Sequence, residues 1–191
     1  IILAGVGGQG ILSIAAIVGA AAIEKGWYLK QAETHGMSQR GGAVMSHLRI
    51  SDQPVASDLI PLGAADVILS VEPMESLRYL PWLSPQGWLV TNSTVFDNIP
   101  DYPDFEMIKE EIRKLPHAVL LDADAMARDL GNPRGSNMVM LGAATPFLGL
   151  DREEITRAIA SFFIKKGDAI VRANIAAFEA GFSFSHKLTL G

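Results

Sequence analysis

Two short stretches contain the residues best suited to bind an anion. The first is Gly5-Val6-Gly7-Gly8-Gln9-Gly10, which has G-x-G-x-x-G spacing at Gly5, Gly7 and Gly10. Glycines let the backbone turn tightly and approach a ligand, and a helix that follows points unpaired amides at the same spot. Such a turn suits a phosphate or a carboxylate. The same glycines also occur where a helix only packs closely on a strand, and the sequence leaves both interpretations open.

The second stretch, from Thr34 to Gly42, is polar and glycine-rich and has no helical period, so it predicts a loop. Arg40 carries a permanent charge in a planar fork that suits carboxylate or phosphate. His35 can donate a proton or a hydrogen bond to a ligand, or can hold the backbone of the loop. Other residues that can contact a ligand or fix the shape of the loop are Ser38, Gln39, Gly36, Gly41 and Gly42.

These stretches follow strands of a predicted α/β fold. Apolar residues from Ile1 predict a buried strand, the uncharged segment Ile11 to Ile23 predicts a buried helix, and Trp27 to Glu33 predicts a second strand. Strand and helix patterns then alternate along most of the chain. The fold class predicted is a doubly wound, mostly parallel sheet with helices on both faces, Rossmann-like, in a single domain covering 1–191.

In such a sheet the ligand site lies outside the carboxyl ends of the strands. We therefore expect one shared rim, made of Gly5 to Gly10, His35 to Gly42, Ser70, Asn92 to Thr94 and Asp122.

The segment Ala43 to Ile50 alternates in polarity and predicts a half-exposed strand, with His47 and Arg49 on a solvated or interface face. No helix fits between it and the preceding strand, so antiparallel pairing is expected. Pro54 to Ile60 is predicted to return as another short strand.

Helix boundaries follow from capping patterns. Helix starts are expected at Glu72-Pro73, Asp104, Asp122, Ser136, Asp168, and at Asp151 with Glu154 as a capping box. Gly181 is expected to end the last helix. The residues after it, Phe182 to Gly191, are then expected to form a tail that docks on a neighbour. Asp122 and Asp124 resemble a carboxylate site, but a strand end and a helix cap account for them more simply.

The composition restricts the function. With 49% hydrophobic and only 19% charged residues, the chain is apolar for a soluble protein, so we expect a partner to cover some of its surface. The net charge of -5 argues against binding to nucleic acid or an anionic membrane. There are no cysteines, which excludes a thiolate-held iron–sulfur cluster on this chain, and His117 and His186 have no clustered partners, so no metal site is expected.

The beginning of the sequence has no pattern of a signal peptide. It begins on Ile1 in a predicted strand, so we expect an initiator Met and a few residues before it, and a cytoplasmic location.

Gly5 to Gly10 and His35 to Gly42 together resemble the gamma-domain family of 2-oxoacid:ferredoxin (flavodoxin) oxidoreductases. The resemblance continues through Asn137, Leu141 and Gly142 to a closing pattern of Lys166-Gly167, Asn174, Ala177-Phe178 and Gly181, and so covers nearly the whole chain. The loop H-G-M-S-Q-R-G-G is similar to the form in beta subunits of indolepyruvate:ferredoxin oxidoreductase, whereas pyruvate and 2-oxoglutarate members usually have a Tyr-Gly-Pro-Glu type of loop.

The resemblance implies the oxidative decarboxylation of an aryl pyruvate. Thiamine diphosphate, with Mg, and iron–sulfur clusters carry the chemistry, coenzyme A takes the acyl group and ferredoxin the electrons. This chain has neither cysteines nor a Gly-Asp-Gly thiamine signature, so these cofactors are expected on a partner alpha subunit. The chain alone is expected to be inactive, and its rim is expected to contact coenzyme A or the mouth of the active site.

The resemblance also implies roles for single residues. Arg40 can hold the 2-oxoacid or coenzyme A, or form an ion pair across the subunit interface, and His35 can act near the substrate. The candidates for cofactor binding are Gly5, Gly7, Gly8, Gln9, Gly10, Ser38, Gln39, Arg40, Gly41, Gly42 and Asn92.

Three alternatives remain. A gamma subunit for pyruvate or another 2-oxoacid has the same fold. A free-standing NAD(P)-dependent reductase needs an acidic ribose ligand about 20 positions after the glycines, for which Glu33 is the one candidate, and a catalytic constellation that is not evident. An interaction module without a ligand uses the glycines only for packing.

Overall fold

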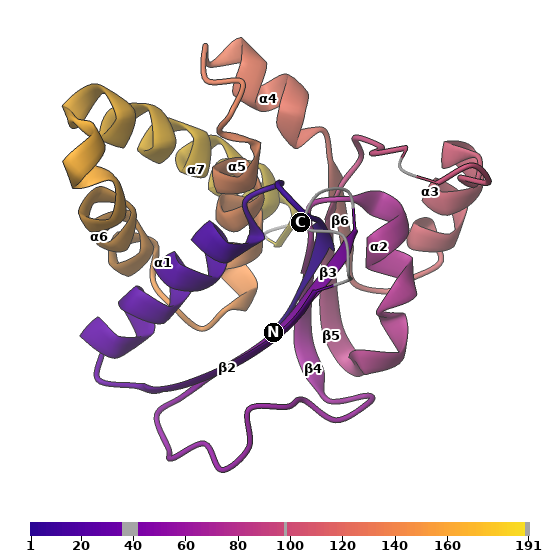
Figure 1. Cartoon of the computed structure of the whole chain (residues 1–191), viewed down its shortest axis with the longest axis horizontal. Helices are drawn as coiled ribbons and strands as arrows, with labels where there is room; N and C mark the ends of the chain where they lie inside the picture. Colours follow the sequence, from indigo (N-terminus) through magenta and orange to yellow (C-terminus); the bar gives the residue numbers. More distant parts are fainter. Residues whose placement is uncertain (36–41, 98, 190–191) are drawn as a thin grey trace.

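The computed structural model describes residues 1–35, 42–97 and 99–189. For His35 and Thr189 it describes the backbone but not the side chain. Six strands form one sheet in the order β2-β3-β1-β4-β5-β6 (Figure 1). The strands are β1 (Ile2–Val6), β2 (Tyr28–His35), β3 (Ala43–Ser51), β4 (Ala65–Ser70), β5 (Leu83–Asn92) and β6 (Ala118–Leu121). This confirms the predicted doubly wound, mostly parallel sheet.

Strand β3 is antiparallel to both of its neighbours, β1 and β2, as expected from the short connection before it. The pairs β1–β4, β4–β5 and β5–β6 are parallel. The four strands β1, β4, β5 and β6 therefore end at one edge of the sheet, where β2 also ends and β3 begins.

Helices cover both faces of the sheet (Figure 1). One core joins the sheet to α1, α5, α6 and α7, and a smaller core on the other face joins it to α2 and α3. The helices are α1 (Ile11–Glu24), α2 (Pro73–Arg78), α3 (Phe105–Arg113), α4 (Ala123–Asp129), α5 (Ser136–Ala144), α6 (Arg152–Phe163) and α7 (Asp168–Thr189), with short 3-10 turns η1 (Leu80–Trp82), η2 (Thr145–Phe147) and η3 (Ile164–Lys166).

Helix α1 is not buried all round, which corrects the sequence-based expectation. Its inner face packs into the core, but Leu12, Ala16, Ala20 and Ile23 are exposed. Leu12 is 55% exposed and Ile23 is 61% exposed. An uncharged sequence predicted burial, but the layer of helices in this chain leaves one side of α1 uncovered.

Helix α7 does not end at Gly181, and this prediction was wrong. The helix continues to Thr189 and includes most of the expected tail. Gly181 is instead a packing position: a Cβ there would lie 1.9 Å from the carbonyl oxygen of Val139 in α5. Gly142 of α5 faces α7 in the same way, and a Cβ on it would lie 1.9 Å from the Phe178 carbonyl oxygen. The two backbones approach so closely that neither position has room for a side chain.

Most predicted caps are confirmed. Asp104 and Asp122 accept hydrogen bonds from backbone amides at the starts of α3 and α4, and Asp151 forms a capping box with Glu154 at α6. Ser136 is not a cap. It is the first residue of α5, and the N-cap is Gly135, whose amide closes a turn on the Asn132 carbonyl oxygen at 2.8 Å.

His47 is buried, at 5% exposure, rather than on a solvated or interface face as predicted. The segment 52–64 covers it, and this segment is not the short strand expected over Pro54 to Ile60. Its backbone is held by side chains from the sheet. His47 Nδ1 accepts the Ile60 amide at 3.1 Å, and Arg49 donates to the carbonyl oxygens of Ser57 and Leu59 at 3.0 and 3.2 Å.

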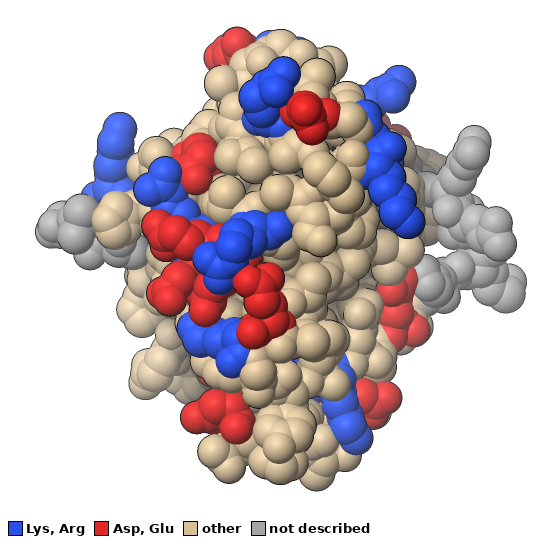
Figure 2. All heavy atoms as spheres, turned by 90° about the vertical axis from the view of Figure 1, so that its left-hand side faces the viewer, with Lys and Arg blue, Asp and Glu red and all other residues tan. Residues whose placement is uncertain are grey.

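Figure 2 shows the side of the molecule on which charges of both signs lie next to one another. Several charged residues of α1, α6 and α7 form ion pairs: Glu24 with Arg157 at 2.8 Å, Lys25 with Glu154 at 3.1 Å, and Arg152 with Glu179 at 2.7 Å. Across the described ranges, no helix has both the length and the apolar character needed to cross a bilayer.

Candidate functional site

The structure brings the two ligand-binding candidate stretches together at the carboxyl edge of the sheet. The backbone amide of Gly7 donates a 2.9 Å hydrogen bond to the carbonyl oxygen of Gly42. Just before this contact, Val6 pairs with Ala43 and His35 pairs with Val44 in the sheet. The glycine turn after β1 and the end of the second stretch therefore share one edge, as predicted.

The predicted site residues between these anchors are only partly visible. Ser38, Gln39, Arg40 and Gly41, and the side chain of His35, lie outside the described residues.

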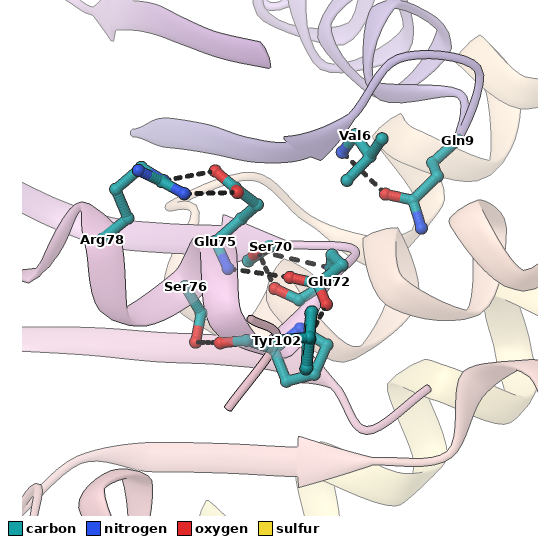
Figure 3. A network of polar contacts seen from close by, with 9 residues as sticks. Val6, Gln9, Ser70, Glu72, Glu75, Ser76, Arg78 and Tyr102 are labelled. Carbon is teal, nitrogen blue, oxygen red and sulfur yellow. Dashed lines mark hydrogen bonds and ion pairs between the residues drawn. The ribbon is translucent and has the colours of Figure 1, made fainter. Parts of the chain in front are cut away.

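Gln9 closes the glycine turn from within. Its Oε1 accepts the Val6 amide at 2.8 Å (Figure 3). Its Nε2 donates to the Val71 carbonyl oxygen at 3.5 Å. Both ends of this amide side chain are used inside the protein. Gln9 therefore shapes the turn, although it was predicted to bind a cofactor.

The glycines of the turn have different roles. A Cβ on Gly5 would lie 2.4 Å from Val71 Cγ2, so Gly5 serves close packing. Gly10 caps α1 with φ +84, and a Cβ there would lie 2.4 Å from Asn137 Nδ2. Gly8 is exposed, and nothing lies within 4 Å of the place where its Cβ would be. The open side of the turn, at Gly8, is the part that a ligand can reach.

Asn92, at the end of β5, is 3% exposed and fully engaged. Its Nδ2 donates to Asp124 at 2.7 Å and to the Val71 carbonyl oxygen at 3.4 Å, and its Oδ1 accepts the Ala123 amide at 3.0 Å. Because all of these groups belong to the protein, Asn92 ties three strand ends together beneath the rim. Asp122 caps α4 and also accepts the Thr94 hydroxyl at 3.4 Å.

A buried carboxylate on this rim was not predicted as a site residue. Glu72 follows β4 and is 0% exposed. Its Oε2 accepts the Glu75 amide at 2.8 Å and caps α2, and its Oε1 accepts the hydroxyl of Tyr102 (Figure 3). The same Oε1 also accepts the Phe96 amide at 3.3 Å. Ser70 supports it by donating its hydroxyl to the Glu72 carbonyl oxygen at 2.6 Å. The sequence placed Glu72 at the start of a predicted helix. Its burial depends on Phe96 and Tyr102, which lie 24 and 30 positions later in the chain.

Burial and the hydrogen bond to Glu72 raise the pKa of the Tyr102 hydroxyl above its ordinary value. Tyr102 therefore stays a proton donor to Glu72. Nearby, Glu75 is 1% exposed, and burial raises the pKa of its carboxyl group although Arg78 opposes this shift. Arg78 Nε and a terminal guanidinium nitrogen reach the two oxygens of Glu75 at 3.0 and 3.2 Å (Figure 3).

Glu33 does not lie where a dinucleotide site needs an acid. It pairs with Ser46, which pairs with Leu3 on the other side of β3. Glu33 is therefore two strands away from β1, or about 10 Å across the sheet. Along the strand direction it is level with Leu3, about three residues or another 10 Å before Val6. In a dinucleotide-binding fold the acidic residue binds the ribose beside the glycine turn, and β3 occupies that position here.

Within the ranges that the structure describes, no group of three or more His, Asp or Glu residues can hold a metal ion. A cavity of about 500 Å³ opens at the opposite end of the sheet, near Ile1, Ser51 and Asp66. It is remote from the glycine turn.

Comparisons with known proteins agree on one family. A family model described as pyruvate ferredoxin/flavodoxin oxidoreductase matches residues 1–184. An indolepyruvate oxidoreductase subunit, IorB, from Pyrococcus horikoshii is 37% identical over 95% of this chain and 93% of its own length. The corresponding IorB from Thermococcus kodakarensis is 36% identical with the same coverage.

Solved structures agree with the fold. The gamma subunit of a keto/oxoacid ferredoxin oxidoreductase from Geobacter sulfurreducens superposes with a TM-score of 0.69, at 25% identity, over 97% of both chains. The 2-oxoglutarate:ferredoxin oxidoreductase from Magnetococcus marinus has a TM-score of 0.77 at 21% identity, and this chain covers 31% of that longer chain.

Proposed function

Because the chain belongs to the pyruvate ferredoxin/flavodoxin oxidoreductase family, we propose that it is the beta subunit of an indolepyruvate:ferredoxin oxidoreductase. The complex converts an aryl pyruvate and coenzyme A into an acyl-coenzyme A and carbon dioxide, and passes electrons to ferredoxin. Support comes from relatives named as indolepyruvate oxidoreductase subunits, at 34 to 37% identity over nearly the full chain. Residues 1–191 act as one gamma-type domain.

The observation that carries the proposal is the hydrogen bond from Gly7 to the carbonyl oxygen of Gly42. It joins at one edge the two sequence stretches on which the resemblance depends. The two stretches would lie apart if the strands that lead into and out of them ended at opposite edges of the sheet. The rim is therefore the surface of this chain that faces the reaction.

The open part of the glycine turn suits an anion. Gly8 is exposed, and the turn leads into α1, whose first amides have no partner within the helix. Backbone amides of Gly8 and Gly10 line the turn, and they hold a phosphate of coenzyme A or a carboxylate at the mouth of the active site. His35, Ser38, Gln39, Arg40 and Gly41 belong to the same surface in this proposal, with Arg40 as the charged ligand.

The remaining cofactors reside on a partner alpha subunit. Thiamine diphosphate with Mg supplies the decarboxylation, and iron–sulfur clusters transfer the electrons. This chain has no cysteine to hold a cluster. Its own contribution is to complete the assembled enzyme and to position coenzyme A or substrate. The assembled enzyme is a cytoplasmic hetero-oligomer that ferredoxin binds transiently.

The test is reconstitution with the thiamine- and cluster-bearing subunit. We expect the purified chain alone to be colourless and inactive with indolepyruvate, and the complex to reduce ferredoxin when indolepyruvate and coenzyme A are supplied. Turnover by the chain alone would contradict the proposal. Comparing indolepyruvate, pyruvate and 2-oxoglutarate with the complex tests the main alternative, a subunit for another 2-oxoacid, which the similarity to 2-oxoglutarate synthase subunits supports.

A free-standing NAD(P)-dependent reductase is the less favoured function, because Glu33 is displaced from the glycine turn by β3. Titration of the chain with NADH and with coenzyme A separates the two functions, since only the reductase requires NADH binding.

A further inference from the structure

One unpaired positive charge lies beside the glycine turn. Arg134 comes shortly before α5 and is exposed, and among the described residues no carboxylate or carbonyl group accepts a hydrogen bond from its side chain. Other arginines of this acidic chain are engaged: Arg152 and Arg157 each pair with a glutamate, at 2.7 and 2.8 Å. The guanidinium of Arg134 keeps its charge at every physiological pH and is available to an external anion.

A contact between α5 and the glycine turn places Arg134 on the rim. The side chain of Asn137, in the first turn of α5, donates from Nδ2 to the carbonyl oxygen of Gly10 at 3.4 Å. Arg134 is three residues before Asn137, so its Cα lies within about 11 Å of the Cα of Asn137. Figure 1 shows the connection between α4 and α5 at the same end of the molecule as the turn between β1 and α1. The long side chain of Arg134 therefore starts next to the turn that suits an anion.

The backbone that carries Arg134 is held in one conformation. The amide of Gly135 donates to the carbonyl oxygen of Asn132 at 2.8 Å and closes a four-residue turn, with Pro133 and Arg134 as its central residues. Proline fixes its own φ angle, and the side chain of Asn132 donates to the Ala173 carbonyl oxygen of α7 at 3.2 Å. Because the turn is already ordered, a ligand of Arg134 has to order only the arginine side chain.

Coenzyme A has two separate anionic groups for such a surface. One is its diphosphate, and the other is the 3′-phosphate on the ribose of its adenosine. The short turn at Gly8 and Gly10 has room for one of the two groups. A phosphate monoester has a charge of about −2 near pH 7, and its oxygens match the two parallel N–H groups of an arginine fork. Arg134 lies beside the turn rather than within it, and this position suits the second group.

We propose that Arg134 binds the 3′-phosphate of coenzyme A while the glycine turn holds the diphosphate. The inference rests on the proposed function, because it takes coenzyme A as the ligand of this rim. It adds a residue that determines specificity: the complex distinguishes coenzyme A from dephospho-coenzyme A, which lacks the 3′-phosphate, through Arg134. The sequence alone did not single out Arg134, because its place beside the turn depends on the contact between Asn137 and Gly10.

The test compares two ligands with the complex reconstituted from this chain and its partner subunit. Calorimetry measures the Kd for coenzyme A and for dephospho-coenzyme A. We expect Arg134→Gln to weaken the binding of coenzyme A about tenfold, because a hydrogen-bonded charge pair is lost, and to leave the Kd for dephospho-coenzyme A unchanged. Arg113→Gln is the matched control. It removes the same charge from an exposed position of α3, on the other face of the sheet, and should change neither Kd.

Arg134→Lys keeps the charge but not the fork and should recover part of the affinity for coenzyme A. Three results would overturn the proposal: an unchanged Kd for coenzyme A in Arg134→Gln, an equal loss for both ligands, or no binding of coenzyme A by the unchanged complex. Turnover of indolepyruvate is measured separately. A complex that oxidises indolepyruvate but does not need Arg134 contradicts only this inference. A complex that binds coenzyme A through Arg134 but does not oxidise indolepyruvate contradicts only the proposed substrate.

Discussion

Glu72 accepts a hydrogen bond from the hydroxyl of Tyr102, which is 30 positions later in the chain. The same carboxylate accepts the amides of Glu75 and Phe96. One buried charge thus caps α2 and fastens the segment after β5 to the rim. Three donors satisfy the carboxylate, so removing one of them is expected to matter more than the loss of an exposed hydrogen bond.

Replacement of Tyr102 by Phe should therefore destabilise the protein. A hydrogen bond to a charged group contributes about 1.5–3 kcal/mol, and we expect a loss of that order in the free energy of unfolding measured with urea. Tyr28→Phe is the control, because Tyr28 is 50% exposed and should tolerate the change. Equal stability of the two variants would argue against a structural role for the Tyr102 hydroxyl.

The raised pKa of Tyr102 gives a separate prediction. On titration to alkaline pH, followed by the ultraviolet absorbance of tyrosinate, the hydroxyl of Tyr102 should ionise only well above the ordinary tyrosine pKa. Burial also raises the pKa of Tyr79, so this hydroxyl too should ionise late. In the Tyr102→Phe variant, the step at the highest pH should be missing.

Gly181→Ala should disrupt the packing of α5 on α7. The added methyl group would lie 1.9 Å from the Val139 carbonyl oxygen, so the helices must separate. We expect a loss of more than about 3 kcal/mol in the free energy of unfolding, or failure to fold. The control is Ala176→Gly on the exposed side of α7, which should cost only about 1 kcal/mol through helix propensity. A well-tolerated Gly181→Ala would mean that the two helices can separate freely.

Gly10→Ala and Gly8→Ala should differ in their effects. Gly10 has φ +84 and its Cβ would meet Asn137, so we expect backbone strain of about 1–2 kcal/mol and an additional steric cost. Gly8 also has positive φ, but its Cβ would meet nothing within 4 Å. Gly8→Ala should therefore be the less destabilising variant in urea. If the turn binds coenzyme A, Gly8→Ala should also raise the KM for coenzyme A in the complex, although it costs less stability than Gly10→Ala.

His47 should make the stability depend on pH. Burial lowers its pKa below the ordinary value of 6.5, so the unfolded chain binds a proton at higher pH than the folded protein does. The stabilisation is complete above the unfolded-state pKa and is lost as the pH falls from about 6.5 toward the lowered folded-state value. Protonated Nδ1 can no longer accept the Ile60 amide.

The measurement is the free energy of unfolding at about pH 7.5 and about pH 5.5, on either side of the ordinary histidine pKa. The drop at the lower pH should be smaller in His47→Gln than in the unchanged protein. An identical pH dependence in the two proteins would show that His47 does not titrate as described.

The sequence by itself determined the fold class, most of the strands and most helix starts. These features depend on neighbouring residues: apolar runs give strands, Asp and Glu at capping positions begin helices, and the short connection after β2 makes β3 antiparallel. The resemblance of Gly5 to Gly10 and His35 to Gly42 to one family was also visible in the letters alone, and the family match confirms it.

The tertiary structure decided which polar groups are already used within the protein. Gln9 and Asn92 are suitable ligand residues by type, but the first closes its own turn and the second ties β5 to α4. Glu72 is buried only because Phe96 and Tyr102 fold back onto it. Gly181 resembles a helix end, yet it lies within α7 because α5 approaches it. Each of these outcomes depends on a contact between distant parts of the chain, and local sequence patterns contain no information about such contacts.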